Sequence, residues 1–263
     1  MRDFFGLSRF SDGSFGFVRN AEGAWSWQHI LFVVLILAVM VALAVFFGIK
    51  NKNASFKNKN KVLIACAILI NAFEIVKIIV LCIRTQNPWH WLNVLPLFLC
   101  SVQLIAIPLA ALCKGRIKEA SLDFVLTFGI LGAIFGTIGA TQNYNAYPVI
   151  SMDNVFSGVT HSISGFASLY IAISGMISLK KKNLPITLTI LGGVSILAYI
   201  ANILLDHNYM FLMRDDGTPY SIVFNLVNGN PVLYPLLVVA LFAIYVIAFY
   251  YIYHLIKKRC GKK

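Results

Sequence analysis

Seven apolar stretches, each about as long as a membrane-spanning helix, divide this chain of 263 residues. A bilayer core of about 30 Å needs about 20 consecutive apolar residues in a helix, so the pattern predicts an all-α, polytopic membrane bundle of seven transmembrane helices. The stretches cover approximately residues 28–48, 62–83, 91–112, 120–140, 158–179, 184–205 and 232–256.

Composition supports a membrane protein and explains the high net charge. Hydrophobic residues make up 59% of the chain, charged residues 12%, and the mean hydropathy is +0.79. A net charge of +12 would suit a nucleic-acid partner, but the basic residues lie in short clusters between apolar stretches. There they set membrane orientation, so we expect no nucleic-acid binding.

The basic clusters predict the topology. Sixteen of the 22 lysines and arginines follow stretches one, three, five and seven, whereas seven of the ten acids lie on the opposite side. The positive-inside rule then places the N-terminus outside and the C-terminus in the cytoplasm. We expect an extracellular or interfacial aromatic segment over 1–25, a seven-helix domain over 26–256 and a basic cytoplasmic tail over 257–263. Abundant Lys, Asn and Ile indicate a bacterial plasma membrane.

Metal and cofactor sites have no signature in the sequence. The five cysteines form no C-x-x-C pair, and most lie inside or at the ends of apolar stretches, which favours neither disulfides nor a zinc site. The histidine spacings indicate no metal site. The last stretch has no lysine, which disfavours a retinal Schiff base, and we predict no cofactor.

The third stretch carries residues that a purely structural span does not require. They are Pro96, Cys100, Ser101, Gln103 and Pro108. Proline frees a backbone carbonyl, and lipid offers no water to bind it, so neighbouring helices must satisfy it. Cys100 follows Trp91 by nine residues, which places it roughly 13 Å into a continuous helix. We therefore predict the wall of a polar site around residues 95–100.

Other polar residues fall in the predicted outer half of the membrane, where they would share an outward-facing cavity. Glu74 and Lys77 are three residues apart and can pair; they are functional candidates, or they neutralise each other and hold the bundle together. His161 could act as a general base, or as a helix-end histidine bonded to Thr160. Cys100 could be a nucleophile or a small packing residue.

The fourth stretch is predicted to pack closely against its neighbours. It carries four glycines at near-helical spacing, Gly129, Gly132, Gly136 and Gly139. Small residues let helix backbones approach each other in lipid, where the hydrophobic effect does not drive helices together. We expect this helix to lie within the bundle.

Three motifs in order resemble a known family. They are the run Leu95-Pro-Leu-Phe-Leu-Cys100, His161 and the run Asn208-Tyr-Met-Phe-Leu212, and His29 at the head of the first stretch is also similar. They resemble the YwaF-type bacterial integral membrane proteins, which are related to eukaryotic transmembrane protein 164, described as a phospholipid acyltransferase with an essential cysteine. The resemblance implies a lipid acyl-transfer reaction with Cys100 as nucleophile and His161 as its helper.

This chain departs from the eukaryotic pattern at the reactive residue. The eukaryotic branch places cysteine and then histidine directly after the proline, whereas Leu97 and Phe98 stand there in this chain. Either Cys100 takes the role from the next helical turn, or the chain does not perform that reaction.

Three functions remain open from the sequence. The first is a lipid acyltransferase whose substrates are membrane lipids. The second is a non-catalytic carrier or receptor for a small polar or amphipathic ligand in the same cavity. The third is a lipid-binding accessory subunit that docks a protein partner, whose nature the sequence leaves unspecified, through residues 1–24. The predicted substrate- or ligand-binding residues are His29, Glu74, Lys77, Gln103, Asn202 and Tyr209.

Overall fold

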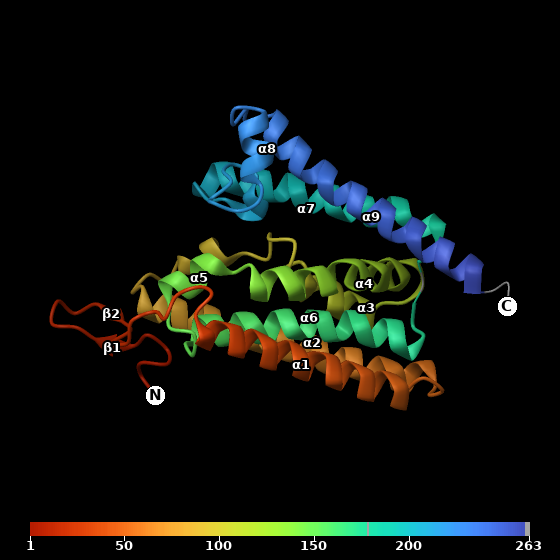
Figure 1. Ribbon diagram of the computed structural model, residues 1–263, viewed down its shortest axis with the longest axis horizontal. Helices are drawn as coiled ribbons and strands as arrows, with labels where there is room; N and C mark the ends of the chain where they lie inside the picture. Colours follow the sequence, from red (N-terminus) through yellow and green to blue (C-terminus); the bar gives the residue numbers. More distant parts are fainter. Residues whose placement is uncertain (178, 261–263) are drawn as a thin grey trace.

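The helices of the protein lie side by side in an elongated bundle in the computed structural model, which describes residues 1–177 and 179–260 (Figure 1). The α-helices are α1 (Trp27–Lys50), α2 (Phe56–Arg84), α3 (Gln103–Leu112), α4 (Gly115–Ile138), α5 (Thr141–Ala146), α6 (Met152–Ser174), α7 (Leu184–Leu205), α8 (Ser221–Leu226) and α9 (Leu233–Cys260). The 3-10 helices are η1 (His90–Val94), η2 (Lys181–Asn183) and η3 (Tyr209–Phe211), and the strands are β1 (Ser8–Arg9) and β2 (Phe15–Gly16).

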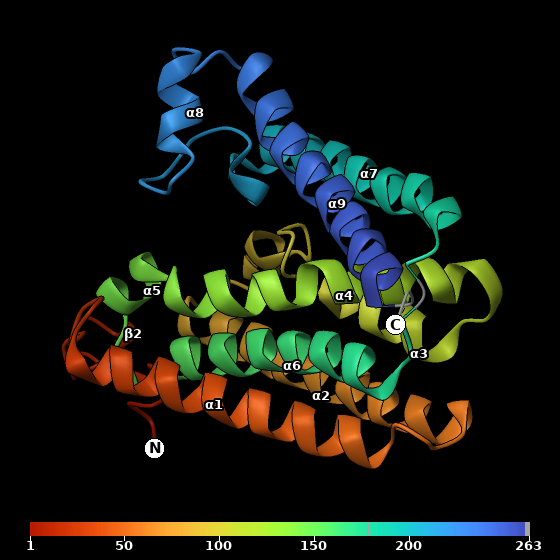
Figure 2. The ribbon, with the colours of Figure 1, turned by 45° about the vertical axis from the view of Figure 1, so that its right-hand side comes forward.

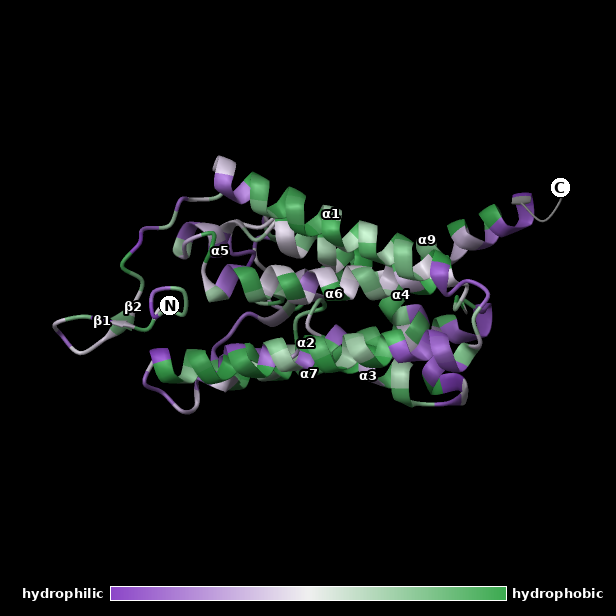
Figure 3. Cartoon of the chain, turned by 90° about the horizontal axis from the view of Figure 1, so that it is seen from below, coloured by the Kyte–Doolittle hydropathy of each residue, from purple (hydrophilic) through white to green (hydrophobic). Residues whose placement is uncertain are grey.

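The helical membrane architecture is confirmed. Hydrophilic segments gather at the two ends of the bundle, and the helix shafts are mostly hydrophobic (Figure 3). Within the described residues, five helical segments are long and apolar enough to cross a membrane: Trp27–Lys50, Phe56–Arg84, Gly115–Ala146, Lys181–Leu205 and Leu233–Arg259. The count of seven spans, the orientation and the three-part division of the chain stay predictions. The last residues of the predicted tail, 261–263, and residue 178 of the fifth stretch lie outside the described residues.

Local sequence signals explain where several helices begin and end. Ser26, Ser55 and Ser151 are N-caps whose hydroxyl groups accept hydrogen bonds from backbone N–H groups of the first turn. Ser55 lets α2 start at Phe56, so part of the basic connection predicted over 50–61 is helical. Ser151 starts α6 ahead of the predicted stretch.

Helix α6 is the centre of the bundle and packs against α1, α2 and α4. Its small residues permit this: a Cβ added to Gly165 would lie 2.5 Å from the Cβ of Ala133 on α4. From the α4 side, a Cβ added to Gly129 would lie 2.5 Å from the carbonyl oxygen of Ser164. The close packing predicted for the α4 glycines is confirmed at Gly129.

The prediction of a continuous helix over 91–112 is wrong. The chain forms η1, then turns without regular helix through residues 95–102, and becomes α-helical only at Gln103. Pro96 is the physical reason, because proline disfavours helical geometry in the residue before it, and Leu95 is extended with φ −59° and ψ 150°. The depth estimated for Cys100 assumed a continuous helix, so that estimate no longer holds.

The second proline of this stretch is accommodated inside α3. Pro108 has no N–H to donate to the carbonyl oxygen of Leu104, four residues earlier. The Asn71 side chain of α2 donates to that oxygen at 3.1 Å. A neighbouring helix therefore satisfies the freed carbonyl, as the sequence analysis expects of an intramembrane proline.

Helices α7 and α9 pack on each other and lean away from the other helices toward the end where α8 lies (Figure 2). At the opposite end a buried carboxylate of α4, Asp123, ties them to the bundle. It accepts hydrogen bonds from the Leu179 N–H at 2.6 Å, the Asn183 amide at 2.9 Å and the Tyr250 hydroxyl at 3.0 Å. One residue thus joins α4, the chain leading into α7, and α9.

The N-terminal segment covers the end of the bundle that holds α5, and it differs from the all-α prediction by its small antiparallel hairpin. The side chain of Glu22 accepts a hydrogen bond from the Val149 N–H, and Gln86 donates to the Gly13 carbonyl. Beneath it, Arg84 at the end of α2 makes two hydrogen bonds of 2.7 Å to Asp153 of α6.

The Arg84–Asp153 pair is expected to stabilise this end of the bundle. Both side chains are only 9% exposed, so Arg84→Ala leaves a nearly buried carboxylate without its partner. We expect the free energy of unfolding to fall by about 3–5 kcal/mol, measured by tryptophan fluorescence during denaturation in detergent. The matched control is Lys180→Ala, because the pair of Lys180 with Glu119 is more exposed, at 48% and 28%. It should change stability by about 1 kcal/mol or less, and an equal effect of both variants would contradict the prediction.

Candidate functional site

Cys100 and His161 both contact the same face of α4. A Cβ added to Gly132 would lie 3.5 Å from the Cβ of Cys100. One helical turn further along, a Cβ added to Gly136 would lie 2.5 Å from Nδ1 of His161. Residues four apart on a helix share a face and are separated by about 6 Å along its axis. The fold thus brings the irregular segment before α3 and the first half of α6 to neighbouring positions.

A charged pair on α2 faces the same region. Lys77 lies 2.6 Å from one carboxylate oxygen of Glu74, and the two side chains are mostly buried. The Lys77 charge is close enough to both Cys100 and His161 to act on them electrostatically. Four of the predicted site residues, from α2, the segment before α3, and α6, therefore form one cluster.

Cys100 lies in the turn before α3, three positions before the first residue of that helix. The backbone N–H groups at the start of α3 are already engaged, because Gln103 donates to the Cys100 carbonyl oxygen and Leu104 donates to the Ser101 carbonyl oxygen. Both Cys100 and His161 are largely buried within the bundle. A thiol and an imidazole in this setting could perform nucleophilic acyl transfer.

Tyr209 holds the segment that carries Cys100. Its hydroxyl donates to the Leu92 carbonyl oxygen and accepts from the Leu95 N–H at 3.2 Å. The Phe98 ring packs on the Tyr209 ring with centroids 5.3 Å apart. Burial raises the pKa of Tyr209, so its hydroxyl keeps the proton that it donates.

Asn202 at the end of α7 in turn holds Tyr209. Its amide donates to the Tyr209 carbonyl oxygen at 3.0 Å and accepts from the Tyr209 N–H at 2.6 Å. Met210 and Phe211 have left-handed φ values of 56° and 55°, which side-chain-bearing residues rarely adopt. The amide of Asn202 is therefore occupied by backbone, and it supports a strained loop that in turn supports the Cys100 segment.

Two other predicted residues occupy different surroundings. Gln103, three residues after Cys100, is fully buried, and within the described residues neither end of its amide has a hydrogen-bond partner. His29 is buried on α1, where its Nδ1 accepts from the Trp25 N–H at 2.9 Å and its ring stacks on Tyr144. The structure thus joins His29 to α5 and the N-terminal segment, without a recorded contact to Cys100 or His161.

Metal binding has no candidate in the part of the chain that the structure describes, where no three His, Cys, Asp or Glu side chains gather as ligands. The cysteines of known side-chain placement, Cys66, Cys82, Cys100 and Cys113, are free thiols.

Comparison with known proteins identifies the family. The model of the TMEM164 family matches residues 24–253. The chain belongs to the TMEM164 family. The match includes every helix of the bundle except the last turns of α9, and therefore the whole Cys100–His161 cluster. No curated protein and no solved structure matches the chain significantly.

Sequence reasoning missed how this TMEM164 family member supports its site. It placed Tyr209 and Asn202 among the binding residues, and the supporting hydrogen bonds of Tyr209 reach across more than 100 residues. It also missed Tyr220, whose ring centroid lies 5.8 Å from that of Phe211, which in turn lies 5.7 Å from that of Phe98 in the Cys100 segment. Tyr220 lies in a long loop where no periodic pattern marks it; only its position directly after the Gly-Thr-Pro turn is visible in the sequence.

Tyr209→Phe tests the support of the Cys100 segment. The substitution removes a hydroxyl that serves two buried backbone groups, so we expect a loss of about 1–3 kcal/mol in stability. The loosened segment should also let a maleimide reagent alkylate Cys100 several-fold faster, as measured by mass spectrometry of the labelled peptide. Tyr251→Phe is the control, because Tyr251 is exposed on α9. Unchanged stability and an unchanged alkylation rate in Tyr209→Phe would refute the role.

Gly136→Ala tests the contact between α4 and His161. The added methyl group would overlap the imidazole ring, so His161 must move. Alanine is otherwise the better helix former by up to about 1 kcal/mol, so a loss of stability would report the steric overlap. Gly193→Ala on α7 is the matched control, because nothing lies within 4 Å of its added Cβ. We expect Gly193→Ala to be neutral or stabilising in thermal unfolding and Gly136→Ala to be destabilising; equal behaviour would argue against the contact.

Proposed function

We propose that this TMEM164 family member is a membrane-embedded lipid acyltransferase of a bacterial plasma membrane, with Cys100 as the nucleophile and His161 as the general base. The observation that carries the proposal is the meeting of these two residues on the Gly132–Gly136 face of α4. Glu74 and Lys77 contribute a charged pair beside them. The long apolar helices would place the site among membrane lipids, which are the proposed substrates.

The reaction follows from ordinary acyl-transfer chemistry. His161 takes the proton of the Cys100 thiol, and the thiolate attacks the carbonyl carbon of a lipid ester. The carbon–sulfur bond forms, the ester carbon–oxygen bond breaks, and the departing alkoxide takes the proton from His161. A hydroxyl group of a second lipid then gives its proton to His161 and attacks the thioester carbon. The new ester carbon–oxygen bond forms, the carbon–sulfur bond breaks, and the departing thiolate takes the proton from His161, which restores the thiol.

Both steps make the same demand on the surroundings of Cys100. The carbonyl oxygen becomes negatively charged during each attack, and donors aimed at that charge lower the barrier. We assign this role to the Ser101 N–H, because the N–H groups of Gln103 and Leu104 at the start of α3 already bind backbone carbonyls. The pairing with Glu74 holds the Lys77 ammonium group in place on α2.

Cys100→Ala is the decisive variant. In vesicles containing the purified protein, acyl exchange between a phospholipid and a lysophospholipid should be lost, as measured by lipid mass spectrometry. The wild-type chain should form a hydroxylamine-sensitive acyl adduct at Cys100. Cys82→Ala is the matched control, because Cys82 is also a free, partly buried thiol but lies near the end of α2. Full exchange activity of Cys100→Ala would exclude Cys100 as the nucleophile.

Ligand binding without chemistry is the second candidate, and the buried amide of Gln103 favours it. An amide without a partner costs about 1–3 kcal/mol, which a bound polar group would recover. If this reading holds, no acyl adduct forms. A lysophospholipid then stabilises Cys100→Ala as much as the wild type in thermal unfolding, and Glu74→Gln removes the stabilisation.

A further inference from the structure

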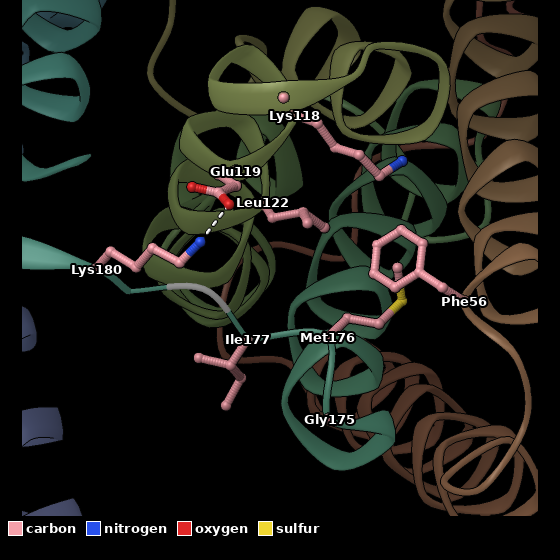
Figure 4. Close-up of a pocket in the computed structure, with 9 residues that line it drawn as sticks. Phe56, Lys118, Glu119, Leu122, Gly175, Met176, Ile177 and Lys180 are labelled. Atoms are coloured by element: carbon pink, nitrogen blue, oxygen red, sulfur yellow. Dashed lines mark hydrogen bonds and ion pairs between the residues drawn. The ribbon is translucent and has the colours of Figure 1, made fainter. Parts of the chain in front are cut away.

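Two adjoining cavities lie at the end of the bundle that holds the lysine-rich connections, away from the N-terminal segment. Each has a volume of about 300 Å³, and Phe56 and Lys118 line both. The first lies between the starts of α2 and α4 and the chain after α6 (Figure 4). The second extends along α2 to the end of α3. Volumes of this size are typical of small-molecule sites.

Lys118 forms the wall between the two cavities. Its ammonium group donates to the Asn60 side chain and the Ala110 carbonyl oxygen, each at 2.7 Å, and to the Ala111 carbonyl oxygen at 3.3 Å, and it lies over the Phe56 ring. It therefore offers an anion its positive charge and no free N–H. Figure 4 shows the Lys118 side chain extending toward Phe56, and the Glu119–Lys180 pair on the other side of the first cavity. The start of α2 and the end of α3 therefore hold the Lys118 ammonium group in place.

Two further lysines at the second cavity retain unbalanced charge. Lys57 and Lys114 line it and are exposed, and neither has an ion-pair partner in the described part of the chain. The second cavity has no acidic lining residue. With Lys118, three ammonium groups therefore surround a space whose local charge is positive, which suits an anion.

Apolar side chains border the same space and point to a lipid rather than a soluble anion. Phe56 is 52% exposed and Leu112 is 69% exposed, and both line the second cavity. A soluble anion gains nothing from exposed apolar side chains. A phospholipid places its phosphate among ammonium groups and its acyl chains against the apolar surface that faces the membrane.

We propose that this double cavity binds the headgroup of an anionic phospholipid, with the phosphate between Lys57, Lys114 and Lys118 and the acyl chains against Phe56 and Leu112. The site lies at the opposite end of the helices from the N-terminal segment and uses none of the residues around Cys100. Its lipid is a bound stabilising lipid and not the acyl substrate, so the site stands or falls independently of acyl transfer.

The test measures thermal unfolding of the full-length protein in a neutral detergent. Phosphatidylglycerol should raise the midpoint, whereas phosphatidylcholine and inorganic phosphate should not. In Lys57→Gln/Lys114→Gln the half-saturating concentration of phosphatidylglycerol should rise at least tenfold, because each lysine adds attraction to an anionic lipid. Both side chains are exposed, so the variant should fold; each single variant repeats the test with a smaller effect.

The control is Lys52→Gln/Lys181→Gln, which removes the same charge from the same end of the bundle, at exposed positions that line neither cavity. It should respond to phosphatidylglycerol like the wild type. Equal weakening in both double variants would show a diffuse charge effect and overturn the site. An equal response to phosphatidylcholine would also overturn it, and an equal response to inorganic phosphate would overturn the assignment to a lipid.

Discussion

The backbone of the third apolar stretch must be satisfied without water, and the rest of the site depends on how this is done. Pro96 prevents a helix over residues 95–102, and Pro108 frees the Leu104 carbonyl. The Asn71 amide of α2 satisfies the freed carbonyl, and the Tyr209 hydroxyl binds the turn before Cys100. Side chains from other elements thus take the place of water along this irregular segment.

Close packing of α4 on α6 is the second requirement of the site. Lipid tails are as apolar as leucine, so helices associate in the membrane through van der Waals contact and hydrogen bonds. Gly129 admits the Ser164 backbone, and the Ser168 hydroxyl donates to the Leu126 carbonyl oxygen at 2.7 Å. Because Gly132 and Gly136 have no side chain, Cys100 and His161 can lie close to α4 at these two positions. Packing and site geometry therefore come from one pattern of glycines.

The sequence predicted the parts of the fold that depend on local patterns. Apolar length located the long helices, and glycine spacing predicted the packing face of α4. The prediction of a continuous helix over 91–112 failed, because apolar composition alone cannot show which proline interrupts a helix. Pro96 ends regular structure before α3, whereas Pro108 lies inside α3. Both carbonyl oxygens four residues before a proline have a partner elsewhere in the chain, Leu104 in Asn71 and Leu92 in Tyr209, and no local pattern contains these partners.

The candidate site was predictable by residue type but not by role. Glu74 and Lys77 could be paired from their spacing, whereas the hydrogen bonds of Asn202 and Tyr209 to backbone could not be predicted, and their role in binding a substrate stays a prediction. Burying a polar side chain in the membrane costs free energy, which a hydrogen bond to a ligand or to a freed backbone group offsets. The sequence does not show which of the two partners the side chain has. In the structure the Asn202 amide is filled by Tyr209, whereas the Gln103 amide has no hydrogen-bond partner in the described residues. Two amides of the same type thus have opposite surroundings, because partners distant in the sequence decide what a buried polar side chain binds.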